Sequence, residues 1–432
     1  MNAIALKRAL DASDDAAFLW VSRRVVVRSS AVTLAALADF DRRLSSLLRE
    51  LSAEPVLAER LLQDEPSAFE SGRAFVTAVV ALRSGAVMVF DQLVTRLESR
   101  PEFISALASA LAWLEFKEVR ACLRRLLTAS DPVAVRLGLA AAVAHRVDPG
   151  APLFRALDAR DPVLRASALE AAGRLAVRDL SPKLLEALND EDAACRFWAA
   201  WSAVRLGEGT GIPVLGRFAL GGGLLAELAC EIALRALGPR EAVRAHARLL
   251  SSTRDERLAV LAAGMIGDPA LVSWLLDRTE SASLARAAGA AFCLVTGRDL
   301  RRDDLDAAGP RRGPEPDLAG ASGLEGSRTV GEVDPAPNGG SPADDADDDL
   351  AWPDVARLRT WWDRNHGEFV PGNRYLAGAL IRHAALADVL RTGNQRQRAA
   401  AALELALLDP ETPFLDVTAP AHRQIGASDP SV

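Results

Sequence analysis

The 432-residue sequence has few of the side chains that build redox, metal or catalytic sites. Only four cysteines occur, and no two of them have the spacing of a metal-binding or redox pair. None of the five histidines has a cysteine, a second histidine or a carboxylate at the spacing of a recognised metal motif. We therefore predict no catalytic residue, no cofactor and no metal site. The cysteines, which we interpret as buried structural thiols, are Cys122, Cys195, Cys230 and Cys293.

Motifs for nucleotide binding or nucleophilic chemistry are also missing. The sequence contains neither a Gly-x-Ser-x-Gly elbow nor a P-loop lysine motif. The stretch Gly207–Gly211 superficially resembles a dinucleotide loop, but it follows a helical segment instead of a strand, which favours a helix-to-helix turn. His145 and His246 are expected at solvated helix ends, and His366 has no neighbouring nucleophile to activate.

Long apolar runs and strand patterns are scarce as well. No uncharged stretch approaches the ~18 residues that cross a bilayer, and the first residues lack the apolar core of a signal peptide. Because reduced thiols suit the cytosol, we expect a cytoplasmic protein without a membrane span. Half of the residues are hydrophobic and only 5% are aromatic, with almost no alternation of apolar and polar positions, so the predicted fold is all-α.

Positive charge is limited and unevenly distributed. The basic residues are nearly all arginine, and the formal net charge is −7. The segment Asp303–Asp349 carries 13 acidic and 3 basic side chains, which leaves the remainder near +3. A nucleic-acid binder is expected to be markedly more basic, so we predict no nucleic-acid partner.

What the sequence does contain is a repeat. Gly207, Gly238, Gly267 and Gly297 each follow an Ala-rich helical stretch, at steps of 31, 29 and 30 residues. A fixed period in this range is typical of a solenoid built from helical hairpins. Each glycine is expected to end a helix in the left-handed conformation.

Prolines mark the opposite end of the repeat. Pro101, Pro132 and Pro162 lie about one period apart at expected helix starts, where the missing N–H costs nothing. Asp131 and Asp161 precede two of these prolines and are placed to cap the free amides. Because one unit cannot bury its own apolar face, the units are expected to stack along a continuous core.

These features resemble HEAT-type repeats, in the bacterial HEAT-like variety, over Pro101–Gly297. About six units are expected there, preceded by a pair at Gly72–Ser99, and Gly221-Gly222-Gly223 marks a degenerate unit. An arginine recurs near the start of the first helices, at Arg165, Arg196, Arg257 and Arg286, with Glu227 where one more would fall. The second helices are expected at Pro182–Leu188, Ile212–Ala219, Arg240–Leu250 and Ala270–Arg278.

The chain divides into five predicted regions. Residues 1–70 form an N-terminal helical cap with an apolar stripe that either packs on the first repeat or binds a partner. Residues 71–300 are the solenoid, and 301–350 form a disordered acidic linker rich in Gly, Pro and Asp. Residues 351–418 form a C-terminal helical region, whose Ala-rich end suggests a closing repeat, and 419–432 a flexible tail.

The C-terminal region has a composition without counterpart among the repeats. It concentrates aromatic and arginine side chains, which are favoured at binding hot spots and are also common in a capping core. We keep both interpretations open. The candidate partner-binding residues are Trp361, Trp362, Arg374, Tyr375, Arg396 and Arg398.

Three segments together resemble a bacterial family of HEAT-like proteins often encoded among type VI secretion genes. They are Leu37–Leu44 with Phe75–Leu82, the repeats themselves, and the C-terminal pattern that runs from Trp361-Trp362 through Gly372-Asn-Arg374-Tyr375 to Gly393-Asn-Gln395-Arg396-Gln397-Arg398. The resemblance implies a secretion-linked context and supplies no mechanism. The long acidic insertion departs from the family pattern.

The function expected from these observations is a non-catalytic scaffold or adaptor that binds protein partners, with type VI secretion components as the implied class. The alternative is an enzyme on the same fold, such as a bilin-lyase-like or DNA-glycosylase-like protein, which rests on analogy of fold alone. A third hypothesis is regulatory: the acidic linker mimics a polyanion and competes for a basic surface. Oligomeric state is not indicated by the sequence.

Overall fold

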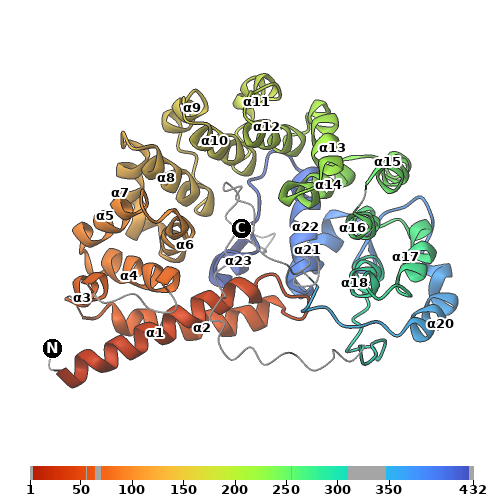
Figure 1. Cartoon of the computed structure of the whole chain (residues 1–432), viewed down its shortest axis with the longest axis horizontal. Helices are drawn as coiled ribbons and strands as arrows, with labels where there is room; N and C mark the ends of the chain where they lie inside the picture. Colours follow the sequence, from red (N-terminus) through yellow and green to blue (C-terminus); the bar gives the residue numbers. More distant parts are fainter. Residues whose placement is uncertain (1–2, 55, 64–69, 254, 310–346, 428–432) are drawn as a thin grey trace. The chain divides into compact units, whose positions relative to one another are not determined.

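The structure, a computed structural model, describes residues 3–54, 56–63, 70–253, 255–309 and 347–427. Helices dominate these residues, and the only strands among them are two of two residues each (Figure 1). The prediction of an all-α, HEAT-like solenoid with an N-terminal helical cap and a C-terminal helical region is therefore confirmed. The contacts divide into two compact units, the described parts of 1–177 with 416–427 and of 178–309 with 347–415.

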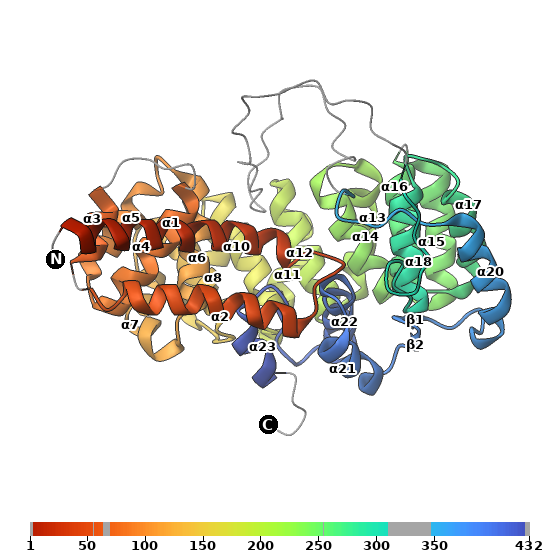
Figure 2. The same cartoon turned by 90° about the horizontal axis from the view of Figure 1, so that it is seen from below.

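In the first unit, one layer of helices runs from α4 through α6 and α8 to α10, and α5, α7 and α9 lie in a second layer. The two long helices α1 and α2 run side by side, and both pack on α4 (Figures 1 and 2). The elements are α1 (Ala3–Val26), α2 (Leu34–Leu51), α3 (Leu57–Gln63), α4 (Glu70–Ser84), α5 (Val87–Arg96), η1 (Pro101–Phe103), α6 (Ile104–Trp113), α7 (Phe116–Leu127), α8 (Pro132–Ala144), α9 (Ala151–Leu157), α10 (Pro162–Arg174) and α23 (Ala421–Ala427).

The N-terminal helices cover the first repeat pair. A Cβ on Gly72 of α4 would lie 2.6 Å from the carbonyl oxygen of Ala17, so glycine lets α1 and α4 approach each other closely. Trp20 stacks on Phe75 with ring centroids 5.2 Å apart, and both side chains are buried. This packing agrees with the interpretation of the apolar N-terminal stripes as a cap.

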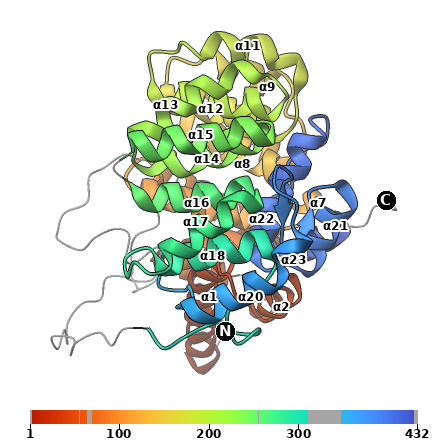
Figure 3. The same ribbon diagram turned by 90° about the vertical axis from the view of Figure 1, so that its right-hand side faces the viewer.

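The second unit repeats the two-layer arrangement. Helices α12, α14, α16 and α18 follow one another in one layer, with α11, α13, α15 and α17 in the other (Figure 3). The elements are η2 (Arg178–Leu180), α11 (Ser181–Ala187), α12 (Ala193–Arg205), η3 (Gly209–Gly211), α13 (Ile212–Gly221), α14 (Leu224–Ala236), α15 (Pro239–Ser252), α16 (Glu256–Ile266), η4 (Pro269–Leu271), α17 (Val272–Arg278), α18 (Ala285–Thr296), α20 (Val355–Asn365), η5 (His366–Glu368), β1 (Tyr375–Leu376), β2 (Ala379–Leu380), α21 (His383–Thr392) and α22 (Gln395–Leu408).

The starts and ends of the repeat helices agree closely with those predicted from the sequence. From Pro101 to Arg278 the described chain passes through six successive helix pairs, and the second helices agree with the predicted ranges to within two residues. The carboxylate of Asp131 accepts hydrogen bonds from the amides of Val133 and Ala134, and Asp161 caps α10 in the same way.

Three of the four periodic glycines adopt the predicted positive φ, at Gly207, Gly267 and Gly297. The prediction was wrong for Gly238, which has φ −61° and ψ 153° and precedes α15 as its N-cap. Pro239 directly follows and restricts the preceding residue to an extended conformation, so α14 ends without a left-handed cap.

The C-terminal region does not extend the array as a closing repeat. After α18, α20 packs on α17, and the antiparallel pair β1–β2, in the register Tyr375 with Leu380, contacts α18. Helix α22 then turns back to pack on α12 and α14, on the side of that layer away from α13 (Figure 1). The predicted continuation was wrong because the Ala-rich sequence of α22 suits any close helix packing, not only the next repeat.

The hairpin docks on the two last periodic glycines. The Tyr375 amide donates to the carbonyl oxygen of Gly267 at 2.9 Å, and the Ala377 amide to that of Leu294 at 2.7 Å. A Cβ on Gly267 would lie 2.3 Å from the Tyr375 carbonyl oxygen, and one on Gly297 2.4 Å from that of Ala377. These glycines therefore serve both helix termination and close backbone approach.

Most of the predicted acidic linker, residues 310–346, lies outside the described residues. Its two ends are described and meet: the Ala307 amide donates to the Trp352 carbonyl oxygen, and the Asp354 amide to that of Leu305, both at 2.8 Å. The predicted boundaries at 301 and 350 therefore include structured residues on both sides of the insertion.

The predicted flexible tail is partly structured. Arg23 forms a two-pronged ion pair with Asp41, with nitrogen–oxygen distances of 2.6 and 3.1 Å. The same guanidinium donates to the carbonyl oxygens of Thr418 and Ala419, and Asp41 accepts from the Ala421 amide at 2.8 Å. This network fixes α23 on α2, so the prediction was wrong for residues 419–427; residues 428–432 lie outside the described residues.

Within the first unit, Arg423 of α23 donates to the carbonyl oxygens of Leu114 and Ala144. His145 lies beside it, with Nε2 2.9 Å from the Leu111 carbonyl oxygen. Burial, with a further contribution from Arg423, lowers the pKa of His145 from 6.5 to about 4. The expectation of a solvated histidine was wrong, because the side chain is partly buried and contacts the Leu111 carbonyl oxygen of α6.

Among the described residues, no helix is both long and apolar enough to cross a membrane.

We predict that Gly267→Ala and Gly297→Ala destabilise the protein more than Gly207→Ala. All three substitutions place a side chain at positive φ, at about 1–2 kcal/mol, but a Cβ on Gly207 meets only Pro410, at 3.8 Å. The first two also push on the hairpin backbone, which adds roughly 1–3 kcal/mol. Denaturant unfolding of the three variants measures this; equal losses would mean that the hairpin yields without cost.

We predict that His145 contributes to acid sensitivity. Because its pKa is lower in the folded protein, its contribution to stability is full above pH 6.5 and is lost as the pH falls from 6.5 towards 4. His145→Gln keeps an N–H for Leu111 and removes the titration. The drop in urea midpoint between pH 7 and pH 5 is expected to be smaller in the variant than in the parent; identical drops would argue against this role.

Candidate protein-interaction site

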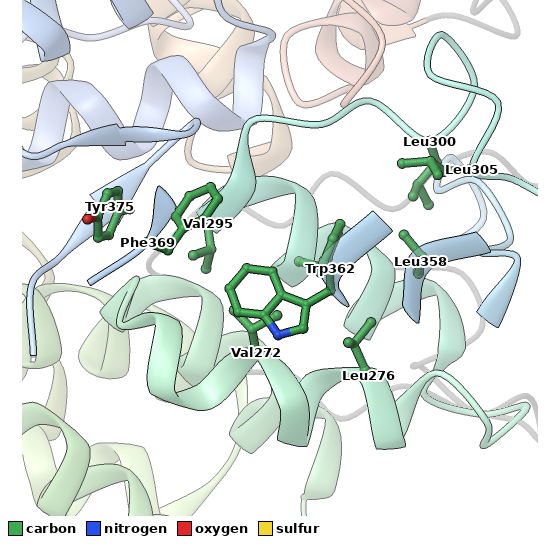
Figure 4. Close-up of a cluster of buried hydrophobic side chains, with 10 residues drawn as sticks. Val272, Leu276, Val295, Leu300, Leu305, Leu358, Trp362, Phe369 and Tyr375 are labelled. Carbon is green, nitrogen blue, oxygen red and sulfur yellow. The ribbon is translucent and has the colours of Figure 1, made fainter. Parts of the chain in front are cut away.

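The aromatic members of the predicted partner-binding set lie in a hydrophobic core. Trp362 and Tyr375 are buried there with Phe369, and Trp361 is partly buried against the same cluster. Figure 4 shows Trp362 over Val272 in the middle of the group, with Phe369 and Tyr375 towards one end and Leu300 and Leu305 at the other. The phenol of Tyr375 also accepts a hydrogen bond from the Val370 amide at 3.0 Å. These side chains attach α20 and the hairpin to α17 and α18.

Arg374 enters a buried ionic network with Glu404 of α22. Its guanidinium pairs with Glu404 and also donates to the carbonyl oxygens of Ile266 and Arg235, both at 2.9 Å. The Arg235 side chain donates to the same Glu404 carboxylate at 2.8 Å, and both groups are almost fully buried. Burial lowers the pKa of Arg374, an effect that the Glu404 carboxylate opposes.

The remaining two candidates act at the start of α22. Arg398 is fully buried and donates to the carbonyl oxygen of Leu390 at 2.7 Å and to the side chain of Gln395. Arg396 is half-buried and pairs with Asp349 at 2.9 Å. The structure thus gives the six residues packing contacts inside the second unit. Their role in partner binding stays a prediction.

An open groove lies between α13 and α15, with α14 as its floor. Its volume is 580 Å³, and it lies within the second unit. Both walls are formed by positions three or four residues apart, so that one face of each helix lines it. The lining residues are Ile212, Pro213, Gly216, Arg217, Ala219 and Leu220 from α13; Cys230, Ala233, Leu234 and Leu237 from α14 and its end; and Glu241, Arg244, Ala245, Arg248 and Leu249 from α15.

Small residues on the walls keep the groove open. A Cβ on Gly216 would meet no atom within 4 Å, and Ala245 stands on the opposite wall. The turn after α13 contains Gly222 and Gly223, both at positive φ, which carry the chain into α14. The degenerate unit that Gly221-Gly222-Gly223 marks in the sequence is therefore where α13 and α15 leave a groove between them.

The groove combines an apolar interior with a positively charged edge. Arg217, Arg244 and Arg248 are exposed, and none of them has an ion pair or side-chain hydrogen bond with a described residue. Glu241 is the one acidic residue of the lining. Within the lining, the apolar side chain of Leu220 remains 49% exposed. Such a surface is suited to an apolar ligand face that also carries carboxylates.

The cysteines and His246 are structural. Cys122, Cys195 and Cys230 are buried, as predicted, and Cys293 is partly buried. Burial raises the pKa of the Cys122 thiol to about 11 and those of Cys230 and Cys293 to about 12, which keeps them protonated. The expectation for His246 was wrong: its side chain is buried, with Nε2 3.0 Å from the Ala259 carbonyl oxygen.

No group of three or more potential metal-ligating side chains comes together within the part of the chain that the structure describes. Gly207–Gly211 forms the turn and η3 between α12 and α13, as predicted for a repeat boundary.

Comparison with protein families supports a HEAT-like repeat protein. Residues 150–221, which span α9 to α13, match the family model for HEAT repeats. No curated protein and no solved structure matches the chain. HEAT repeats are generally protein-interaction scaffolds, which is consistent with an exposed groove as the candidate site.

We predict that Glu404→Gln destabilises the second unit by roughly 3 kcal/mol or more, because Arg235 and Arg374 lose their shared buried counterion. Glu411→Gln is the matched control: its pair with Arg178 is exposed and contributes less than about 1 kcal/mol. Denaturant unfolding followed by tryptophan fluorescence checks both; a loss for Glu404→Gln no larger than the control's would show that the network is dispensable.

Proposed function

We propose that the protein is a non-catalytic interaction scaffold whose α13–α15 groove receives an amphipathic helix of a protein partner. The observation that carries this proposal is the apolar groove edged by three arginines without an ionic partner among the described residues. A helix with an apolar face and flanking Asp or Glu matches both features.

The dimensions support a helical occupant. The wall formed by α13 extends from Ile212 to Leu220, which corresponds to roughly 12 Å, or about two turns, of helix. Two turns of a partner helix present side chains at i, i+3, i+4 and i+7, enough to place two or three apolar anchors over Cys230, Ala233 and Leu234. Arg217 on one wall and Arg244 and Arg248 on the other then meet acidic residues at the flanks.

The partner class implied by the family resemblance is a component of a type VI secretion system, and we propose it as the source of the helix. The HEAT-repeat match supports protein binding in general, and the secretion context rests on the resemblance of the N-terminal, repeat and C-terminal segments. Identification of the captured helix tests both statements separately.

We predict that Gly216→Leu blocks the groove without loss of stability. The new side chain enters empty space on a helical position, where replacement of glycine also favours the helix by up to about 1 kcal/mol. Ala247→Leu on the exposed part of α15 outside the lining is the matched control. Both variants are expected to unfold at or above the parent's denaturant midpoint.

The binding test uses a photo-crosslinking amino acid in place of Leu220 in the full chain, in native cells. We expect one segment of one protein to be crosslinked, with an apolar helical face and an excess of Asp and Glu. Gly216→Leu should abolish the crosslink, Ala247→Leu should keep it, and Arg244→Glu with Arg248→Glu should weaken it at least tenfold. A crosslink that survives Gly216→Leu, or a segment without acidic residues, contradicts the proposal.

A further inference from the structure

The acidic run at the end of the insertion is bound residue by residue to three arginines. Asp347 forms a two-pronged pair with Arg257, at 2.9 and 2.8 Å. Asp348 pairs with Arg286 at 2.9 Å, and Asp349 with Arg396 at 2.9 Å. Three consecutive carboxylates are thus each held by an arginine from a different helix: α16, α18 and α22.

The recurring arginines of the repeats are used in two ways. Arg165 and Arg196 each direct Nη1 to carbonyl oxygens of the turn that precedes their own helix, at 2.7 to 3.2 Å. Arg257 and Arg286 instead contact carboxylates that lie 90 and 62 residues further along the chain. Arg257 and Arg286 thus bind the acidic segment, whereas the equivalent arginines of the other two repeats bind the turn before their own helix.

The residues that follow the three aspartates, 350–353, also contact the repeat helices. Leu350 is buried, and the Arg286 guanidinium lies 6.0 Å from the Trp352 ring centroid. Pro353 lies against Gly289 of α18, where an added Cβ would be 3.3 Å from the proline ring. An acidic run followed by apolar and aromatic residues therefore binds α16 and α18 in the manner of a peptide ligand.

The three ion pairs differ in their access to solvent. The Asp347 side chain is 6% exposed, whereas those of Asp348 and Asp349 are 43% and 31% exposed. The hydrogen bonds that the Arg257 guanidinium donates to the Asp347 carboxylate raise the pKa of Arg257. Partly exposed pairs contribute only about 0.2–1 kcal/mol each, so two of the three can be opened by a competing carboxylate at little cost.

We propose that Arg257, Arg286 and Arg396 form a binding site for a run of acidic residues in a partner polypeptide, and that Asp347–Asp349 occupy this site within the same chain until the partner displaces them. The internal segment competes at an effective concentration of about millimolar, as a tethered ligand does. An external acidic peptide then binds weakly to the parent protein and tightly once the internal carboxylates are neutralised. This site is separate from the α13–α15 groove and does not depend on it.

The experiment measures the anisotropy of a labelled peptide with the sequence of residues 347–354, Asp-Asp-Asp-Leu-Ala-Trp-Pro-Asp, added to the full chain. The triple variant Asp347→Asn, Asp348→Asn, Asp349→Asn is expected to bind it at least tenfold more tightly than the parent, with affinity falling as salt rises. Adding Arg257→Gln, Arg286→Gln and Arg396→Gln should return binding to the parent's level or below. Circular dichroism confirms that each variant keeps its helices.

Two outcomes would overturn the proposal. Equal peptide affinity for the parent and the triple asparagine variant would show that the internal carboxylates do not compete. Absence of binding to a well-folded triple variant would show that the segment is a permanent part of the fold. A single-stranded oligonucleotide serves as the second probe; if it binds the triple variant and the peptide does not, the site recognises phosphate and the proposal is wrong.

Discussion

The fold depends on the burial of alanine-rich helix faces against neighbouring helices. No single helix pair has enough apolar surface to form a core, so the helices of one layer must approach each other closely along the array. Alanine and glycine at the contacts make this possible, as Gly72 does between α1 and α4 and Gly264 does between α16 and α18, where a Cβ would lie 2.9 Å from that of Ala291. Where a small residue meets no neighbouring atom, as at Gly216, it leaves open space.

Polar contacts fix the position of the C-terminal region, which the packing of alanine-rich helix faces alone does not determine. Small apolar surfaces can pack in many registers, so the position of the C-terminal region is fixed by polar groups with definite geometry. Glu404 pairs with both Arg235 and Arg374, and the hairpin amides donate to the carbonyl oxygens of Gly267 and Leu294. Arg23 and Asp41, which pair with each other, bind the backbone at the start of α23. Each of these joins segments distant in sequence. Buried ionic groups of this kind are a means of fixing one arrangement among several, at a cost in desolvation.

The sequence predicted local structure well and long-range placement poorly. Asp-Pro starts, glycine ends and the 30-residue period depend on backbone chemistry within one turn, so the helix pairs and caps could be inferred. The return of α22 onto α12 and α14, the docking of α23 and the burial of Trp362, Tyr375 and Arg398 depend on contacts that no local pattern encodes. The groove had one visible signal in the sequence, the three glycines at the end of α13. The Asp347–Asp349 contacts could not be predicted, because they depend on the positions of three separate helices.

The return of the C-terminal region also bears on how the chain acquires its structure during synthesis. Most repeat arrays form from contacts between neighbours, so they can fold progressively from the first unit onward. Here the Arg235 guanidinium pairs with Glu404, which lies 169 residues further along the chain. Arg205 donates to the carbonyl oxygen of Pro410, which lies 205 residues further along. Contacts at such separation form slowly because a long loop must close first. Until translation reaches α22, the nascent second unit therefore carries cations on α12 and α14 that still depend on water for solvation.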